Sequence, residues 1–277
     1  MNRPTVLRRI LTTDLPVLLM VVLAMGPFVW MILTSLTPSE RLSATGVSLS
    51  PAGWGLDNYA RLFEQTSFLG NMGHSLIVAV GTVLLGLAVS VTAAYAFSRF
   101  RFRGRKAIML QFLLVNMFPV VLLILPLFVL MRRLGILDTH LGLIIANATV
   151  AIPFAVWMLT SYIGAIPKSL DEAATVDGAG WFRIYRSIIM PLSGPAIATV
   201  AILTFLPAWN QYLWPLMVVQ TEELRPVMVG IDYFKQLNVS WGQIMAYATM
   251  ITVPILVLFI AFQRSFINSI ASSGVKG

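Results

Sequence analysis

The stretch from Lys168 to Pro191 reads KSLDEAATVDGAGWFRIYRSIIMP, and it is polar although the long runs on both sides of it are apolar. Its pattern is that of a short helix, because Ser169 can act as N-cap and Glu172 follows at the capping-box spacing. Gly178 stands where a helix can end in a left-handed turn. A second short amphipathic segment then runs from Trp181 to a stop at Pro191. The stretch therefore predicts a helix-turn-helix that docks on another protein.

The composition of the whole chain indicates an integral membrane protein. Of its 277 residues, 58% are hydrophobic and only 11% are charged, whereas soluble domains carry roughly 25% charged residues. The net charge of +8 does not indicate nucleic-acid binding, because the basic residues fall in the gaps between apolar runs. The chain has no cysteine and two histidines, so thiolate chemistry is excluded and a histidine metal cluster is not expected.

Six apolar runs are each near or above the roughly 20 residues that span a hydrocarbon core. The sequence therefore predicts an all-α polytopic membrane protein with six transmembrane helices. The expected spans are 15–36, 75–97, 107–131, 141–163, 193–219 and 243–262. The fifth span opens with Ser193-Gly194-Pro195, where proline is tolerated in the first helical turn, and it is interrupted by the stretch 207–215.

The distribution of basic residues orients these spans. With the N-terminus in the cytoplasm, 13 of the 19 Lys and Arg lie on the inner side, as the positive-inside rule requires. Most of this bias comes from the cluster 99–106, which we interpret as a topology signal, while the pair Arg132-Arg133 is discordant. The rule predicts that both termini and the stretch 168–191 are cytoplasmic.

The chemistry-bearing residues favour neither an enzyme nor a self-sufficient carrier. All eleven acidic residues fall in loops or at span ends, which disfavours a proton- or sodium-coupled secondary carrier. Such a carrier stays an alternative, because backbone carbonyls can hold sodium. No GxxxxGK[ST] loop is present, so the chain does not bind ATP in that way. No catalytic constellation for an intramembrane enzyme can be assembled. If the chain moves a solute actively, the energy must come from another subunit.

Several polar groups nevertheless lie within the spans. For Asn147 and Tyr247 we favour hydrogen bonding to neighbouring helices. The amides of the stretch 207–215 lie between two tryptophans and beside Pro207, which removes a backbone hydrogen bond from its helix. That combination suits a path for a hydroxyl-rich solute, and it is equally the pattern of an interfacial aromatic belt. The predicted substrate path consists of Asn116, Trp209, Asn210, Gln211, Trp214 and Tyr247.

Three motifs resemble those of ABC-importer permeases. Glu172-Ala173-Ala174, three residues, Gly178, nine residues and then IIMP (188–191) match the EAA loop of that family. Met190 stands where leucine is usual, which is a volume-conserving change. AWNQYLWPL (208–216) resembles the fifth span of carbohydrate-type permeases, and the terminal SSGVKG resembles their usual end. The chain is similar to the shorter six-span partner in the maltose, oligosaccharide and glycerol-3-phosphate permeases.

This resemblance implies a type I ABC importer (MetI-like) transmembrane fold in the inner membrane. It implies a tail, first helix and external loop over 1–70, a core over 71–263 with a coupling helix at about 168–180, and a cytoplasmic tail over 264–277. The implied partners are a second permease subunit in a heterodimer, two ATPase subunits and a periplasmic or lipid-anchored solute-binding protein. The chain itself would bind no cofactor, since ATP and Mg²⁺ belong to the ATPase, and the cargo would be sugar-like.

The resemblance also assigns residues to the ATPase interface. Coupling to the ATPase falls to Glu172, Ala173, Ala174, Asp177, Gly178 and Pro191. The C-terminal contact falls to Ser273, Gly274, Val275, Lys276 and Gly277. Two alternatives stay open, a permease for glycerol-3-phosphate or another non-sugar solute, and a self-sufficient secondary carrier.

Overall fold

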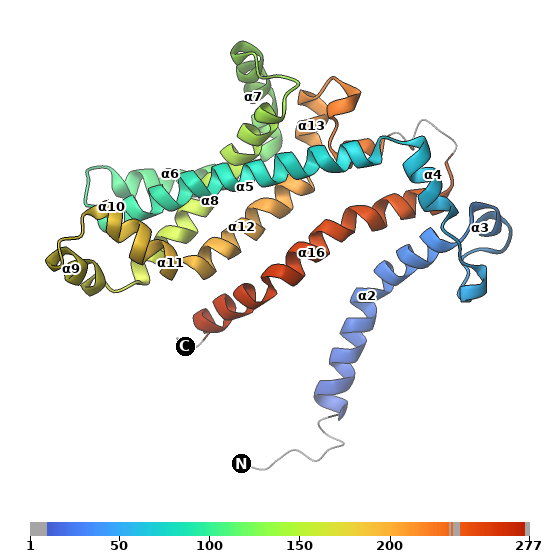
Figure 1. Cartoon of the computed structure of the whole chain (residues 1–277), viewed down its shortest axis with the longest axis horizontal. Helices are drawn as coiled ribbons and strands as arrows, with labels where there is room; N and C mark the ends of the chain where they lie inside the picture. Colours follow the sequence, from blue (N-terminus) through green and yellow to red (C-terminus); the bar gives the residue numbers. More distant parts are fainter. Residues whose placement is uncertain (1–9, 233, 235–238, 275–277) are drawn as a thin grey trace. The chain divides into compact units, whose positions relative to one another are not determined.

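The computed structural model describes residues 10–232, 234 and 239–274, and no strand occurs within these ranges (Figure 1). The α-helices are α2 (Leu15–Leu36), α3 (Ser39–Thr45), α4 (Asp57–Gln65), α5 (Phe68–Arg99), α6 (Arg105–Met117), α7 (Val120–Leu134), α8 (His140–Ala165), α9 (Ser169–Val176), α10 (Trp181–Ile184), α11 (Met190–Leu192), α12 (Gly194–Trp209), α13 (Leu213–Val218), α14 (Val227–Gly230) and α16 (Trp241–Gly274). Short π or 3₁₀ turns are η1 (Ile10–Asp14), η2 (Pro51–Gly53), η3 (Tyr185–Ile189) and η4 (Glu222–Leu224).

The chain divides into two compact units, Met1–Phe68 with Ile231–Pro254, and Leu69–Gly230 with Ile255–Gly277.

The helices provide between four and six membrane spans among the described residues. Four helices are long and apolar enough alone, namely Thr12–Leu36, Phe68–Arg99, His140–Ala165 and Trp241–Gln263. Two bent pairs also qualify, Arg105–Met117 with Val120–Leu134 and Trp181–Leu192 with Gly194–Trp209. The expected number of six spans is reached when each bent pair counts as one span. The second pair runs from 181 to 209 and so differs in its bounds from the expected fifth span, 193–219.

The third expected span, 107–131, is not one continuous helix. The chain turns by 104° between α6 and α7, at Phe118 and Pro119. The physical reason is that a residue before proline is sterically pushed out of the α region, and Phe118 has extended dihedrals (φ −75°, ψ 131°). In the fifth span the expected interruption is present, since α12 ends at Trp209 and α13 begins at Leu213.

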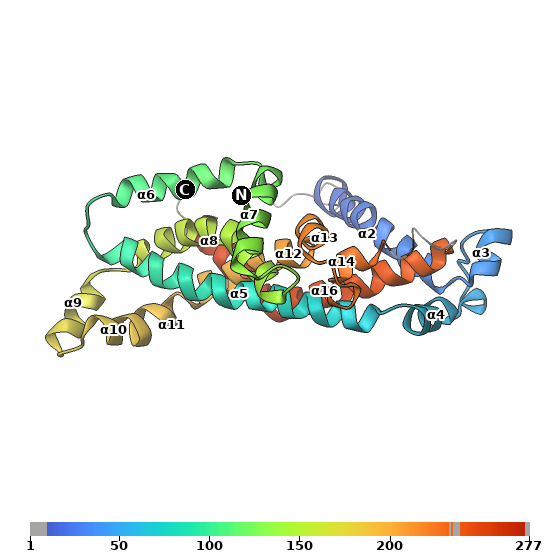
Figure 2. The ribbon, with the colours of Figure 1, turned by 90° about the horizontal axis from the view of Figure 1, so that it is seen from above.

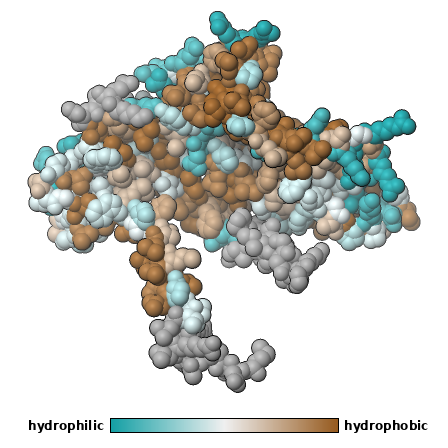
Figure 3. Space-filling model, turned by 180° about the vertical axis from the view of Figure 1, so that it is seen from behind, coloured by the Kyte–Doolittle hydropathy of each residue, from teal (hydrophilic) through white to brown (hydrophobic). Residues whose placement is uncertain are grey.

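Apolar side chains cover much of the surface, as a lipid-facing protein requires. Along α2 the large hydrophobic residues from Leu15 to Ile32 are mostly exposed, and a helix that is apolar all round suits a membrane span. Figure 3 shows broad apolar patches on one face of the molecule. These features, together with the candidate spans, make the chain a multi-pass membrane protein.

The first unit is held together around a buried amide. Asn58 of α4 donates from Nδ2 to the carbonyl oxygens of Ser35 (2.9 Å) and Thr37 (2.8 Å), and it accepts from the Ser39 hydroxyl. The backbone of Gly242 at the start of α16 approaches this amide so closely that a Cβ there would lie 2.5 Å from Nδ2. A side chain at position 242 would therefore displace the Asn58 amide.

The second unit contains two hydrophobic clusters. In both views α8 lies beside α5 and α12 (Figure 1, Figure 2). One cluster joins these three helices to the α10–η3 segment through buried residues that include Tyr95, Leu159, Ile184, Ile189 and Val200. The other joins α5, α7, α8 and α13 through Val78, Met131, Leu143, Ala146, Trp214 and Val218. The α9–α11 segment projects at one end of this unit, past the end of α5 (Figure 2).

Candidate functional site

The polar stretch 168–191 forms the expected helix-turn-helix, but it begins differently from the prediction. Ser169 is the first residue of α9 rather than its N-cap, and no side chain caps the helix. Lys168 already has helical dihedrals (φ −68°, ψ −21°), so its carbonyl accepts from the amides of Asp171 and Glu172 at 3.0 Å each. The predicted capping box is therefore wrong. The two acidic residues in the first turn still favour the helix through its dipole.

The turn after α9 is the one expected at Gly178, which has φ +78°. The Ala179 amide donates to the Ala174 carbonyl oxygen at 2.9 Å, which closes the turn. The chain then continues through α10, the π-helical η3 and α11. The segment ends at Leu192, one residue after Pro191, and the chain bends by 74° before α12, so the predicted stop is confirmed to within one residue.

Most of the predicted coupling residues are on the outside of this segment. Glu172, Ala173 and Asp177 are exposed, whereas Ala174 packs on the hydrophobic cluster behind it. Apolar side chains are exposed beside them, with Val176 at 88% exposure. A hollow of about 210 Å³ lies between α9 and the α10–η3 segment, lined by Ala174, Asp177, Ala179, Arg183, Ser187 and Ile188. The surface thus combines apolar and charged groups, as docking surfaces do.

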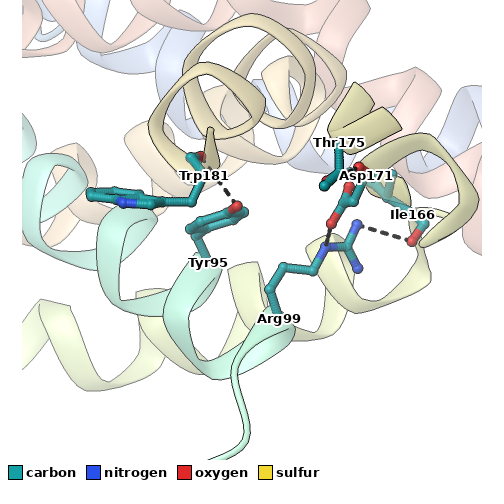
Figure 4. Close-up of polar contacts among 6 residues, drawn as sticks. All are labelled: Tyr95, Arg99, Ile166, Asp171, Thr175 and Trp181. Atoms are coloured by element: carbon teal, nitrogen blue, oxygen red, sulfur yellow. Dashed lines mark hydrogen bonds and ion pairs between the residues drawn. The ribbon is translucent and has the colours of Figure 1, made fainter. Parts of the chain in front are cut away.

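The segment 168–191 is attached to the end of α5 by a mostly buried ion pair. Arg99 Nε lies 2.6 Å from Asp171 Oδ2, and the two side chains are 6% and 18% exposed. Arg99 Nη2 also donates to the carbonyl oxygen of Ile166, just after α8, at 3.2 Å (Figure 4). One guanidinium therefore joins α5, the end of α8 and α9.

A second contact, one turn earlier on α5, holds the other arm of the hairpin. The Tyr95 hydroxyl donates to the carbonyl oxygen of Trp181 at 3.4 Å (Figure 4), and the rings of Tyr95 and Tyr185 lie 5.2 Å apart. Residues four apart on a helix share a face, so Tyr95 and Arg99 present one face of α5 to both arms. Both arms of the α9–α10 hairpin are therefore attached to the end of α5.

Sequence reasoning missed this role of Arg99, because the cluster 99–106 was interpreted as topology alone. Asp171 was also absent from the predicted coupling residues. The available signal was the position of Arg99 just after the expected span 75–97, whereas Arg101 and Arg103 lie further on, in the loop between α5 and α6.

A cavity of about 260 Å³ lies between α6, α8 and α12 in the second unit, and part of the predicted substrate path lines it. It is lined by Asn116, Val120, Asn147, Val150, Ala151, Phe154, Leu203, Thr204, Pro207, Ala208 and Gln211. Asn116 and Gln211 were predicted, whereas Asn147 was interpreted as a helix-packing residue. Asn147 is 7% exposed and its Nδ2 has no hydrogen-bond partner among the described residues. A buried amide left in that state costs about 1–3 kcal/mol.

The remaining predicted path residues do not line this cavity. Asn210 is exposed, while Trp209 and Trp214 are fully buried in the packing of the second unit. Tyr247 belongs to the first unit, where its ring packs edge-on against Phe68 and Phe234, with centroids 5.1 Å away in each case. Large aromatic rings in these positions contribute packing area.

A separate group of hydrogen bonds lies at the loop between α7 and α8. Asp138, at φ +56° between α7 and α8, accepts from the hydroxyl of Thr221 and from the backbone amides of Gln220 (2.9 Å) and Thr221 (3.1 Å). Hydrogen bonds from the Thr221 hydroxyl and then its amide lower the pKa of the Asp138 carboxyl. The rings of His74 in α5 and His140 in α8 stack on each other, and His74 Nδ1 lies 2.9 Å from His140 Nε2. These contacts connect α5, α7, α8 and the segment after α13.

The predicted C-terminal contact can be followed only in part. Ser273 and Gly274 are the last residues of α16, which extends well past the expected end of the sixth span at 262. Val275, Lys276 and Gly277 lie outside the described residues.

Comparison with known proteins places the chain in a family. Residues 86–271 match the family described as "Binding-protein-dependent transport system inner membrane component". The chain is 33% identical to the "Trehalose/maltose transport system permease protein MalG" of Thermococcus litoralis, with 99% of each chain covered. It is 34% identical to the "Arabinooligosaccharides transport system permease protein AraQ" of Halalkalibacterium halodurans, with 92% of each covered.

A solved structure agrees on the fold. A chain of a bacterial ABC transporter involved in the import of the acidic polysaccharide alginate superposes with a TM-score of 0.82 at 24% identity, covering 95% of this chain and 99% of that one. The expected type I importer fold is therefore confirmed. The chain belongs to the family of binding-protein-dependent transport system inner membrane components, and it is a permease pore subunit of an ABC importer.

Proposed function

We propose that this chain forms half of the translocation pore of an ATP-driven importer for neutral saccharides, and that it receives the energy of ATP hydrolysis through α9. The observation that carries the coupling proposal is the exposed α9–Gly178–α10 hairpin held against the end of α5 by the Arg99–Asp171 pair. A hairpin that is exposed on one side and fastened to a membrane span on the other is suited to transmit movement.

In this proposal the hairpin seats in a cleft of an ATPase subunit. Glu172 and Asp177 pair with basic groups of the ATPase, while Val176 and Leu170, both exposed, enter an apolar part of the cleft. Closure of the ATPases on ATP moves the hairpin, and the guanidinium of Arg99 carries that displacement into α5 and α8. The pore then alternates between inward- and outward-facing states.

The complex we propose contains this chain, a different second permease subunit, two ATPase subunits and a solute-binding protein on the outside. ATP and Mg²⁺ are held by the ATPases, and the present chain is a non-catalytic pore subunit. Both termini lie in the cytoplasm, an orientation that rests on the placement of 13 of the 19 basic residues. The tail 273–277 contributes a further contact to the ATPase.

The saccharide class is supported by the relatives and by the cavity. The two relatives named above are permeases for trehalose/maltose and for arabinooligosaccharides. None of the residues that line the 260 Å³ cavity is charged. A phosphorylated solute would call for basic side chains, so this lining favours a neutral saccharide over glycerol-3-phosphate.

The coupling role is tested by replacing Glu172 with alanine in the assembled transporter. We expect saccharide uptake to fall, and co-purification of the ATPase subunits to weaken, because α9 loses a charged contact. Glu223→Ala is the matched control, since Glu223 is an exposed glutamate outside the hairpin. Wild-type uptake and wild-type assembly in the Glu172 variant would contradict the proposal.

A further inference from the structure

We propose that the cavity between α6, α8 and α12 is a saccharide subsite of this subunit, in which Asn147 Nδ2 donates a hydrogen bond to a solute hydroxyl. The inference deepens the proposed function and rests on it. It assigns direct solute contact to this subunit, and it names a residue that sequence reasoning had interpreted as structural.

The wall of the cavity on α8 is one continuous helix face. Asn147, Val150, Ala151 and Phe154 follow at the spacing i, i+3, i+4 and i+7, which puts all four side chains on the same side. The amide therefore lies at one end of an apolar strip and an aromatic ring at the other. Polar groups at a few points of a mostly apolar wall are the usual composition of a small-molecule site.

Asn147 itself is the unusual member of this wall. Its side chain is more than nine-tenths buried and its Nδ2 has no hydrogen-bond partner in the described part of the chain. Buried amides of native proteins nearly always have partners. The residue borders the cavity, while its Nδ2 atom has almost no accessible surface of its own. A turn of the side-chain amide brings Nδ2 to a solute in the cavity, and a solute hydroxyl then supplies the partner that the described residues do not.

The facing wall offers complementary groups. Asn116, at the end of α6, donates to its own helix at Phe112 (2.7 Å), which directs its amide group while leaving acceptor capacity. Gln211 lies in the break between α12 and α13 and is half-buried. Amides both donate and accept, as sugar hydroxyls do. On the α8 wall opposite, Phe154 is 40% exposed and adds an aromatic ring to the lining.

The breaks in the helices create this arrangement. The turn at Pro119 brings Asn116 and Val120 to the cavity from two different helices, and the end of α12 at Trp209 frees Gln211 from the helix. The volume of about 260 Å³ is below the roughly 300–1,000 Å³ of sites for drug-sized ligands. The subsite therefore fits a sugar ring rather than a long oligosaccharide at once.

The test uses the complete transporter in proteoliposomes with labelled maltose and trehalose, and a set of their monodeoxy analogues. If the wild-type complex takes up a sugar, we expect it to prefer that sugar over one monodeoxy analogue by about tenfold, the effect of one lost hydrogen bond to a buried partner. In Asn147→Leu this preference should disappear, while ATPase activity stimulated by the binding protein stays near wild type. Gln211→Leu is the second variant. Gln211 lies in the break between α12 and α13, and we expect this variant to lose less of the preference than Asn147→Leu.

The control is Thr149→Val on the exposed side of α8, because the Thr149 hydroxyl donates to the Ile145 carbonyl of its own helix and Thr149 does not line the cavity. It should keep the wild-type preference. If both cavity variants retain every preference of the wild type, or if they lose uptake and ATPase stimulation together, the subsite is wrong. If the wild-type complex takes up neither sugar nor any analogue while ATP hydrolysis is intact, the proposed saccharide function itself fails and the subsite with it.

Discussion

Arg99 Nε lies 2.6 Å from Asp171 Oδ2, and this pair fastens the exposed α9 hairpin to the end of a membrane span. The two residues are far apart in the sequence and come together only because α8 returns the chain to the end of α5. The same guanidinium donates to Ile166 at the end of α8. The pair thus fixes where the hairpin lies relative to two spans.

Removing one partner of this pair should destabilise the second unit. Arg99→Met leaves the Asp171 carboxylate mostly buried without its counter-charge, and breaking a buried pair from one side costs about 3–5 kcal/mol. With Asp171 partly exposed we expect the lower end of that range, seen as a lower unfolding temperature of the purified complex. Arg99→Met/Asp171→Leu should recover most of the loss, because the unpaired charge is then gone. A double variant no more stable than the single one would contradict this account.

Gly178 should tolerate substitution less well than its neighbour Gly180. A side chain would meet nothing within 4 Å at either position, but Gly178 has φ +78° and Gly180 has φ −70°. Gly178→Ala should therefore cost about 1–2 kcal/mol of backbone strain and reduce uptake, whereas Gly180→Ala should leave uptake unchanged. Equal effects of the two alanines on uptake in proteoliposomes would show that the turn conformation is not what matters.

The stability of the second unit should depend on the ionisation of Asp138. Because its hydrogen bonds lower the pKa of this carboxyl below the usual 3.8, the ionised form stabilises the fold above pH 3.8. That stabilisation is lost as the pH falls through the folded-state pKa. Asp138→Asn should thus unfold at a lower temperature than wild type at neutral pH, and the gap should close at pH values below 3.8.

The matched control for this titration is Glu222→Gln. Glu222 is exposed and pairs with Arg225 at 3.1 Å, and exposed pairs contribute little to stability. Its unfolding temperature should follow that of wild type throughout. If the unfolding temperatures of Asp138→Asn and wild type differ equally at low and at neutral pH, the carboxylate charge of Asp138 does not stabilise the fold.

Gly242→Ala should destabilise the first unit through Asn58. The added methyl group would lie 2.5 Å from Asn58 Nδ2, which already donates to Ser35 and Thr37. Displacing the amide loses two hydrogen bonds of about 1 kcal/mol each. Gly73→Ala in α5 is the control, because nothing lies within 4 Å there and alanine favours a helix by about 0.5–1 kcal/mol. Thermal unfolding of both variants measures the difference.

Local patterns in the sequence predict most of the helices and one of the turns. The apolar runs located the membrane helices, and Gly178 marked the left-handed turn because few other residues adopt φ near +78°. The proline at 119 was visible, yet its 104° bend was not expected, since other prolines such as Pro126 and Pro153 stay inside helices. Whether a proline ends a helix depends on the packing around it.

The candidate site was less predictable, because it depends on contacts between distant segments. No periodicity links Arg99 to Asp171, or Asn147 to Gln211. The tryptophans 209 and 214 illustrate the same limit, since an aromatic residue beside amides has the same pattern whether it lines a path or is buried, and both are buried here. Burial is a property of the tertiary structure, which composition around one residue does not reveal.

The most direct measurement of the central claim is uptake of labelled maltose and trehalose by proteoliposomes that contain this chain with and without its ATPase subunits. We predict that uptake requires the complete complex, ATP on the side of the membrane that carries the ATPases, and an intact Glu172. We predict no uptake by the chain alone under a proton or sodium gradient. Ion-driven uptake by the chain alone would contradict this prediction and would identify a self-sufficient carrier.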